Sequence, residues 1–190
     1  MEPRLQTKVT DKNQIDFYQS LYSTNKPLLD LTAISADQYL LVDCQGDAYR
    51  QKYPNLNIVI LETLSTAKQF KLGQKQFDFL IDNQIYNNLT WPKINTNNCA
   101  VIFDQSPLLK YLTVAEITAS LEKLADRYCP NTVLLQSSLF FIDDNRLGDR
   151  FYNLKDIQIK NYVVEKFYYD TTTAKLTMQF KIKKIYDNTN

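Results

Sequence analysis

The 190-residue sequence contains no histidine and only three glycines. Without histidine, the chain cannot form a Ser-His-Asp or Cys-His nucleophile system, and it lacks the commonest zinc ligand. With so few glycines, a loop that wraps closely around a phosphate group is not expected, because such loops need backbone positions with positive φ. These two absences exclude several common classes of enzyme.

No apolar run in the sequence approaches the roughly 18 residues that suggest a membrane span. The stretch Met1–Gln6 lacks the apolar core of a secretory signal, so we expect a cytoplasmic, intracellular protein with no membrane partner. The length of 190 residues favours one domain. A composition of 44% hydrophobic and 23% charged residues is that of a globular protein.

The three cysteines, Cys44, Cys99 and Cys129, are far apart in the sequence and form no C-x-x-C pair. Each lies in or beside an apolar stretch. Free cysteine is among the most buried residue types, so we expect three buried thiols. We predict no metal site.

The net charge of +1 gives the chain no general attraction to nucleic acid. Positive charge is nevertheless concentrated near the C-terminus, at Lys175, Lys181, Lys183 and Lys184. A solvated strand face explains these lysines better than a nucleic-acid contact, so nucleic acid is not an expected partner.

Five short apolar stretches predict the parallel strands of an α/β sheet, since runs rich in β-branched residues are typical of strands buried on both faces. They lie at 39–43, 57–62, 77–82, 99–104 and 132–137. Two further stretches, 162–169 and 174–185, are predicted to form an antiparallel hairpin, because apolar and polar residues alternate along the second.

Three helices are expected. Asp11 is predicted to cap a leading helix that covers a sheet edge, and a weaker helix is expected over 65–72. The clearest signal is the capping box from Thr113 to Glu116, in which both side chains satisfy free backbone N–H groups. An apolar stripe follows it, formed by Val114, Ile117, Leu121, Leu124 and Tyr128.

These elements predict a Rossmann-like three-layer αβα sandwich, with a mostly parallel seven-stranded sheet and a C-terminal antiparallel hairpin. We expect residues 1–190 to form a single domain. Within it, 1–36 form a leading helical segment, 37–138 the parallel βα core and 160–186 the terminal hairpin.

Four predicted strands end on an acid: Asp43, Glu62, Asp82 and Asp104. Ligands of open α/β sheets bind at the carboxyl ends of the strands, where carboxylates can accept hydrogen bonds from ribose hydroxyls or hold a divalent cation. Aspartate also satisfies the local backbone where a strand ends in a turn. The series therefore has a structural explanation beside the functional one.

The sequence resembles the class I S-adenosylmethionine-dependent methyltransferases over residues 37–186. That family has five parallel strands followed by a β-hairpin. The stretch 42–48 is similar to its first-strand turn, 60–65 to its second strand with a ribose-binding acid, and 103–107 to its fourth-strand end.

The resemblance implies a cofactor and a set of site residues. S-adenosylmethionine would be the cofactor, and the protein would be methyltransferase-like with an unidentified acceptor. By resemblance, Asp43, Gly46 and Asp47 would line the cofactor loop, Glu62 would bind the ribose hydroxyls, Asp82 and Asn83 would meet the adenine, and Asp104 would face the acceptor as the catalytic-site acid.

The first loop departs from the family pattern, which usually has three glycines. Here Gly46 is accompanied only by the small residues Cys44 and Ala48. This departure, with the aromatic-rich hairpin, supports an alternative: a non-catalytic structural or interaction protein, such as an assembly component. The partner, whether methyl acceptor or protein, and self-association stay open. A magnesium nucleotide site is less favoured, because the sequence has no G-x-x-x-x-G-K-[ST] loop.

Overall fold

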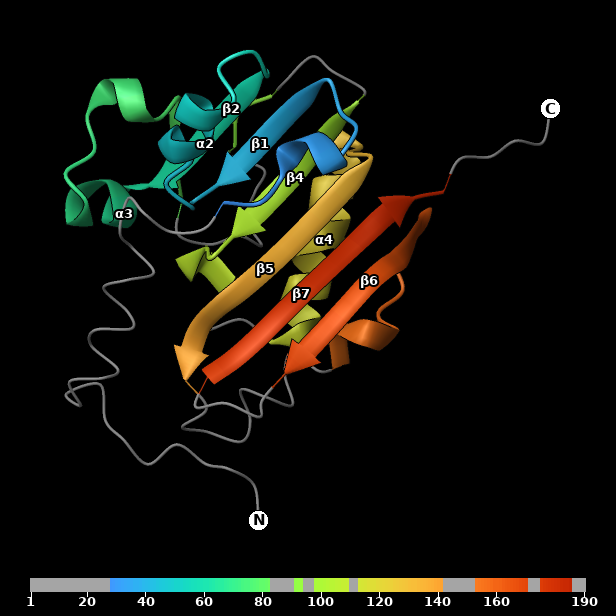
Figure 1. Cartoon of the computed structure of the whole chain (residues 1–190). Coiled ribbons are helices and arrows are strands. Elements are labelled where there is room, and N and C mark those ends of the chain that lie inside the picture. The colour runs from blue at the N-terminus through green and yellow to red at the C-terminus, as the bar shows by residue number, and fades with distance from the viewer. Residues whose placement is uncertain are drawn as a thin grey trace.

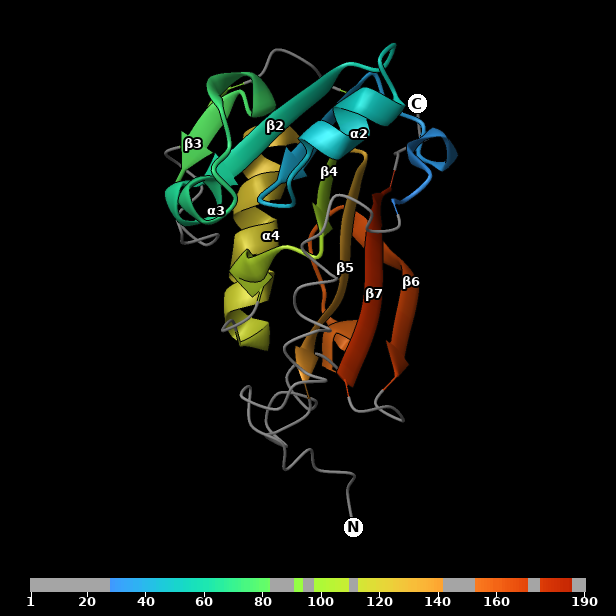
Figure 2. The ribbon, with the colours of Figure 1, turned by 60° about the vertical axis from the view of Figure 1, so that its left-hand side comes forward.

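The computed structural model describes residues 28–82, 91–93, 98–109, 113–141, 153–170 and 175–185. Within these ranges seven strands form one sheet, in the order β3-β2-β1-β4-β5-β7-β6 (Figures 1 and 2). Strands β1 to β5 pair in parallel with one another, whereas β7 lies antiparallel between β5 and β6. The predicted fold class is confirmed.

The predicted strands are all present, although several differ from the expected ranges at their ends. They are β1 (Gln38–Val42), β2 (Ile58–Thr63), β3 (Phe79–Ile81), β4 (Cys99–Asp104), β5 (Thr132–Phe141), β6 (Tyr162–Asp170) and β7 (Lys175–Lys184). The described helices are α2 (Asp47–Lys52), α3 (Leu64–Gln69) and α4 (Val114–Tyr128), with short 3-10 turns η1 (Leu31–Ala33), η2 (Gln74–Gln76), η4 (Pro107–Leu109) and η5 (Asn153–Asp156).

The sheet has an apolar core on each face. Helix α4 packs on one face, against side chains such as Leu40, Val101 and Phe103. Turn η1 and helix α2 pack on the other, where Leu41, Ile60 and Ile102 point; Figures 1 and 2 show α4 and α2 on opposite sides. All six residues of β4 are buried because this central strand is covered on both faces.

Helix α4 begins as the sequence predicts. The Thr113 hydroxyl accepts a hydrogen bond from the Glu116 N–H at 3.1 Å, and the Glu116 carboxylate accepts one from the Thr113 N–H at 3.0 Å. Ile117, Leu121, Leu124 and Tyr128 are buried, so the predicted apolar stripe faces the core. Capping and patterning agree here, which explains why a local signal located this helix.

Helix α3 is shorter than expected. It is capped by Thr63, whose hydroxyl accepts from the Thr66 N–H at 3.1 Å, and it ends at Gln69 rather than continuing to residue 72. Lys71 has a φ of 52°, a left-handed conformation that ends the helix before Gly73. The leading helix predicted from Asp11 lies outside the described residues.

The prediction of three buried thiols is wrong for one cysteine. Cys44 and Cys99 are buried, but Cys129 is exposed. Cys129 follows α4 with a φ of 45°, and this left-handed turn places its side chain outside the core. Burial raises the pKa of the Cys99 thiol to about 11, so this thiol stays protonated at neutral pH.

No helix in the described ranges has both the length and the apolar character needed to cross a membrane.

Candidate functional site

The carboxyl ends of β1, β2 and β4 form the candidate site. β1 pairs in parallel with both β2 and β4, so these strands end at one edge of the sheet. Asp43, Glu62 and Asp104 are all buried there, with exposed fractions of 2%, 0% and 0%. Because burying a carboxylate without partners is costly, their hydrogen bonds decide what this edge can do.

Asp43 ties the end of β1 to the start of α3. Its carboxylate accepts hydrogen bonds from the Thr63 N–H and the Thr63 hydroxyl, both at 3.0 Å. Burial raises the pKa of the Asp43 carboxyl, while hydrogen bonds from Thr63 and Thr66 oppose that rise. Both observed contacts therefore connect Asp43 to the chain itself, and its predicted role in the cofactor loop stays a prediction.

The loop after β1 turns tightly against the sheet. Asp43 and Gln45 have φ values of 50° and 54°, a left-handed conformation that is uncommon for residues other than glycine. Gly46 is not left-handed, with a φ of −62°. A Cβ atom at Gly46 would lie 3.0 Å from Ile60 Cγ1 and 3.1 Å from Leu41 Cβ. The one glycine of this loop is therefore needed for its close packing on β1 and β2.

Glu62 lies at the end of β2 and reaches toward the same loop. Its Oε1 accepts a hydrogen bond from the Gln45 N–H at 3.3 Å. This distance is longer than the typical 2.9–3.0 Å, so the contact is a weak one. The Glu62 carboxylate is fully buried beside the first loop, and its predicted role as the ribose-binding acid stays a prediction.

Asp104, at the end of β4, is bound by a residue that the sequence did not single out. The Tyr49 hydroxyl donates to Asp104 Oδ2 and accepts from the Leu29 N–H at 2.9 Å. Tyr49 is fully buried, and burial followed by the charge of Asp104 raises the pKa of its hydroxyl. This chain of hydrogen bonds joins the residues before η1, helix α2 and the end of β4.

The other predicted site residues lie apart from this buried group. Asp47, at the start of α2, accepts a hydrogen bond from Gln51 Nε2 at 2.8 Å on the helix surface. Asp82 follows β3 and is exposed. Asn83 lies outside the described residues. The structure thus brings together three of the four strand-terminal acids, and it leaves Asp82 at the surface.

The described ranges contain no group of three or more Cys, Asp or Glu side chains placed to hold a metal ion.

The acids were the part of the site that the sequence could predict, because strand ends can be located from apolar runs. Tyr49 lies in a segment without a recognisable helical stripe, and nothing in the sequence relates it to Asp104.

No protein-family model and no curated protein sequence matches the chain. Several solved structures do match it in fold. The N-methyltransferase NodS from Bradyrhizobium japonicum WM9 matches with a TM-score of 0.51 at 7% identity, over 94% of this chain and 100% of that one. LepI in complex with SAH and a substrate analogue matches with a TM-score of 0.47 at 9% identity, over 93% of this chain. An rRNA methylase from Escherichia coli gives 0.47 at 11% identity, over 80% of this chain.

The chain spans 53% of the LepI chain and 59% of the rRNA methylase chain, but the whole of NodS. At 7% identity the NodS likeness concerns the fold. That fold agrees with the strand order observed here, in which five parallel strands are followed by the inserted antiparallel strand β7. The chain therefore has a Rossmann-like, methyltransferase-like fold, as NodS does.

Proposed function

We propose that the chain is an S-adenosylmethionine-binding, methyltransferase-like protein whose cofactor lies at the carboxyl edge of the sheet. The observation that carries the proposal is the buried Glu62 carboxylate at the end of β2, in contact with the loop that follows β1. The fold shared with the N-methyltransferase NodS supports the same edge as the binding site.

The Glu62 side chain fits the ribose part of such a cofactor. An ionised carboxylate only accepts hydrogen bonds, and ribose hydroxyls donate them. Its contact with the Gln45 N–H is long, at 3.3 Å, so that bond is readily exchanged for one from a ribose hydroxyl. Because Glu62 is 0% exposed, the first loop must move for a ribose to reach it. Asp43 is suited to a different task, since its two 3.0 Å bonds to Thr63 fix the loop against β2.

The bound cofactor would supply a methyl group already activated by a sulfonium, so the chain needs no histidine base for the transfer. The protein would act mainly by holding the two reactants in line. Tyr49 fixes the orientation of the Asp104 carboxylate at the end of β4, where the resemblance places the acceptor. Tyr49 donates to one of the two Asp104 oxygens, so an acceptor would contact the other oxygen or displace the Tyr49 hydroxyl.

A second candidate function is a non-catalytic protein that binds other proteins. It is favoured by the hydrogen bonds at the carboxyl edge of the sheet. Thr63, Gln45 and Tyr49 already donate to the three buried acids there. Edge strand β3 also exposes two large apolar side chains, Phe79 at 45% and Leu80 at 49%. An exposed apolar edge strand is a common place for another chain to dock.

Calorimetric titration with S-adenosylmethionine and S-adenosylhomocysteine separates the two candidates. We expect micromolar binding that Glu62→Gln weakens by about 1–3 kcal/mol, through loss of charge-assisted hydrogen bonds. The matched control is Glu122→Gln, the same substitution at an exposed position of α4, which should bind like the unmodified chain. Equal affinity in both variants would dismiss Glu62 as the ribose ligand.

If protein shown to be folded binds neither ligand, the non-catalytic candidate is favoured. The cytoplasmic location expected from the sequence forms part of the first proposal, and cell fractionation checks it.

A further inference from the structure

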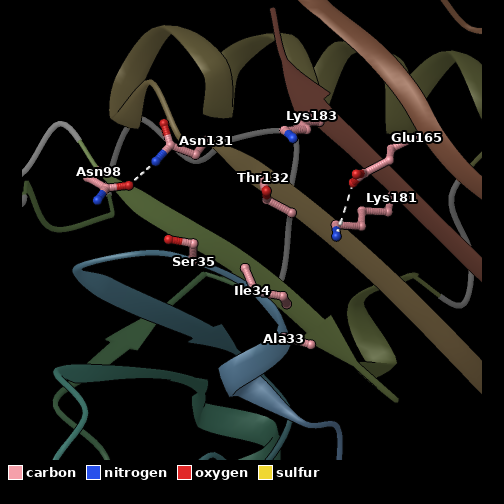
Figure 3. A pocket seen from close by; sticks show the side chains of 9 residues that line it. All are labelled: Ala33, Ile34, Ser35, Asn98, Asn131, Thr132, Glu165, Lys181 and Lys183. Carbon is pink, nitrogen blue, oxygen red and sulfur yellow. Dashed lines mark hydrogen bonds and ion pairs between the residues drawn. The ribbon is translucent and has the colours of Figure 1, made fainter.

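A groove of about 510 Å³ lies at the amino ends of β4 and β5, on the sheet edge opposite the buried carboxylates (Figure 3). Residues 33–35, at the end of η1 and just after it, form one side, and strands β5, β7 and β6 form the other. Its volume lies within the roughly 300–1,000 Å³ of small-ligand sites. Neither function proposed above uses this groove.

The groove is lined mainly by polar and charged side chains. Its charged side chains are Lys181, Lys183 and Glu165, and its polar ones include Ser35, Asn98, Asn131 and Thr132. Lys181 Nζ lies 3.0 Å from Glu165 Oε2, which holds this ammonium group beside the groove. Lys183 is exposed, and it has no ion pair within the part of the chain that the structure describes. The lining therefore carries a net charge of about +1.

Strand register places a third lysine next to Lys181, outside the groove lining. Lys166 on β6 lies directly opposite Lys181 on β7, and Lys183 lies opposite Thr132 on β5. Side chains of directly paired residues share a face of the sheet, and like charges placed opposite each other are destabilising. Lys166 does not itself line the groove, so the cations available to a ligand there are Lys181, which Glu165 pairs, and Lys183.

We propose that this groove binds a small molecule through a phosphate group, with the ammonium group of Lys183 and the hydroxyl of Thr132 as its principal donors. The concave shape between the η1 segment and β5 suits a compact ligand. A nucleic-acid strand is disfavoured as the occupant, because a tight polyanion contact uses several unpaired cations and Glu165 neutralises Lys181 here.

The experiment uses the full chain and pyrophosphate as the probe. Calorimetry should detect saturable pyrophosphate binding that Lys183→Gln weakens about tenfold, as expected for the loss of one charge-assisted hydrogen bond. The matched control is Lys160→Gln, an exposed lysine that does not line the groove, and its affinity should stay within about twofold. Glu62→Gln should leave pyrophosphate binding unchanged, because Glu62 lies at the opposite edge.

Amide resonances provide a second measurement that does not depend on a variant. On addition of pyrophosphate, the Thr132 and Lys183 amides should shift and those of the carboxyl edge should not. Three results overturn the proposal: no pyrophosphate binding by folded protein, equal losses in the Lys183 and Lys160 variants, or binding of a single-stranded oligonucleotide with affinity that grows with its length while pyrophosphate does not bind.

Discussion

Removing one hydroxyl group should test how firmly the carboxyl edge is held together. Tyr49→Phe keeps the buried ring but removes the donor to the Asp104 carboxylate and the acceptor of the Leu29 N–H. A hydrogen bond to a charged group contributes about 1.5–3 kcal/mol, and a neutral one about 1 kcal/mol. Because the Tyr49 side chain is fully buried, water cannot easily replace the lost hydroxyl as a partner for Asp104 and the Leu29 N–H. We expect a loss of about 2–4 kcal/mol in the free energy of unfolding.

Urea unfolding measures this loss, and the neighbouring Tyr53→Phe is the matched control. Tyr53 lies just after α2, and among the described residues its hydroxyl has long contacts, at 3.3 Å to the Leu29 carbonyl and 3.4 Å to Asp30 Oδ1. Its removal should cost less than about 0.5 kcal/mol. If Tyr49→Phe cost no more than Tyr53→Phe, the buried chain of hydrogen bonds described here would be refuted.

Tyr49→Phe should also change how the free energy of unfolding depends on pH at high pH. Burial and the neighbouring Asp104 raise the pKa of the Tyr49 hydroxyl in the folded chain. The unfolded chain therefore releases this proton first, and the stability that Tyr49 contributes is present below about pH 10 and is lost as the pH rises further. Unfolding curves collected from about pH 8 to 11 should fall more steeply for the unmodified chain than for Tyr49→Phe. Parallel curves would contradict the raised pKa.

Three further substitutions test the loop and helix α4. Because the pKa of Asp43 is raised, the folded chain binds this proton more tightly than the unfolded chain, and the free energy of unfolding should fall as the pH rises from about 4. Asp43→Asn should flatten that part of the pH profile measured by urea unfolding. Equal slopes in the two proteins would argue against the raised pKa. Gly46→Ala should lower the free energy of unfolding by about 1–3 kcal/mol through overpacking. The control Gly73→Ala should cost far less, because its Cβ would have no neighbour nearer than 3.8 Å. Similar melting temperatures for the two variants would contradict the close packing of the loop at Gly46. Thr113→Ala should cost about 1 kcal/mol through loss of the helix cap, and an unchanged melting curve would count against the cap.

The fold was predictable because its signals are local. The runs that became β2 and β4 are rich in apolar residues within a few positions, and the capping box at Thr113 needs four consecutive residues. Element ends were less predictable, since Lys71 and Cys129 adopt left-handed conformations that their residue types do not announce. The exposed position of Cys129 follows from that turn.

The candidate site was predictable only in part. Strand ends placed Asp43, Glu62 and Asp104 at one edge, but their partners depend on contacts between distant segments. Tyr49 is separated from Asp104 by 55 positions, and no periodicity relates the two. The groove was likewise hidden, because Thr132 and Lys183 meet only through the register of β5 on β7, and Glu165 meets Lys181 only through that of β6 on β7, which includes a bulge.

The most direct test of the central proposal follows the Gln45 amide resonance during titration with S-adenosylhomocysteine. The Gln45 N–H donates to Glu62, so a ligand that takes this carboxylate must change the environment of that amide. The proposal predicts a saturable shift of the Gln45 resonance that Glu62→Gln weakens. An unchanged Gln45 resonance throughout the titration, in a spectrum of folded protein, would contradict it.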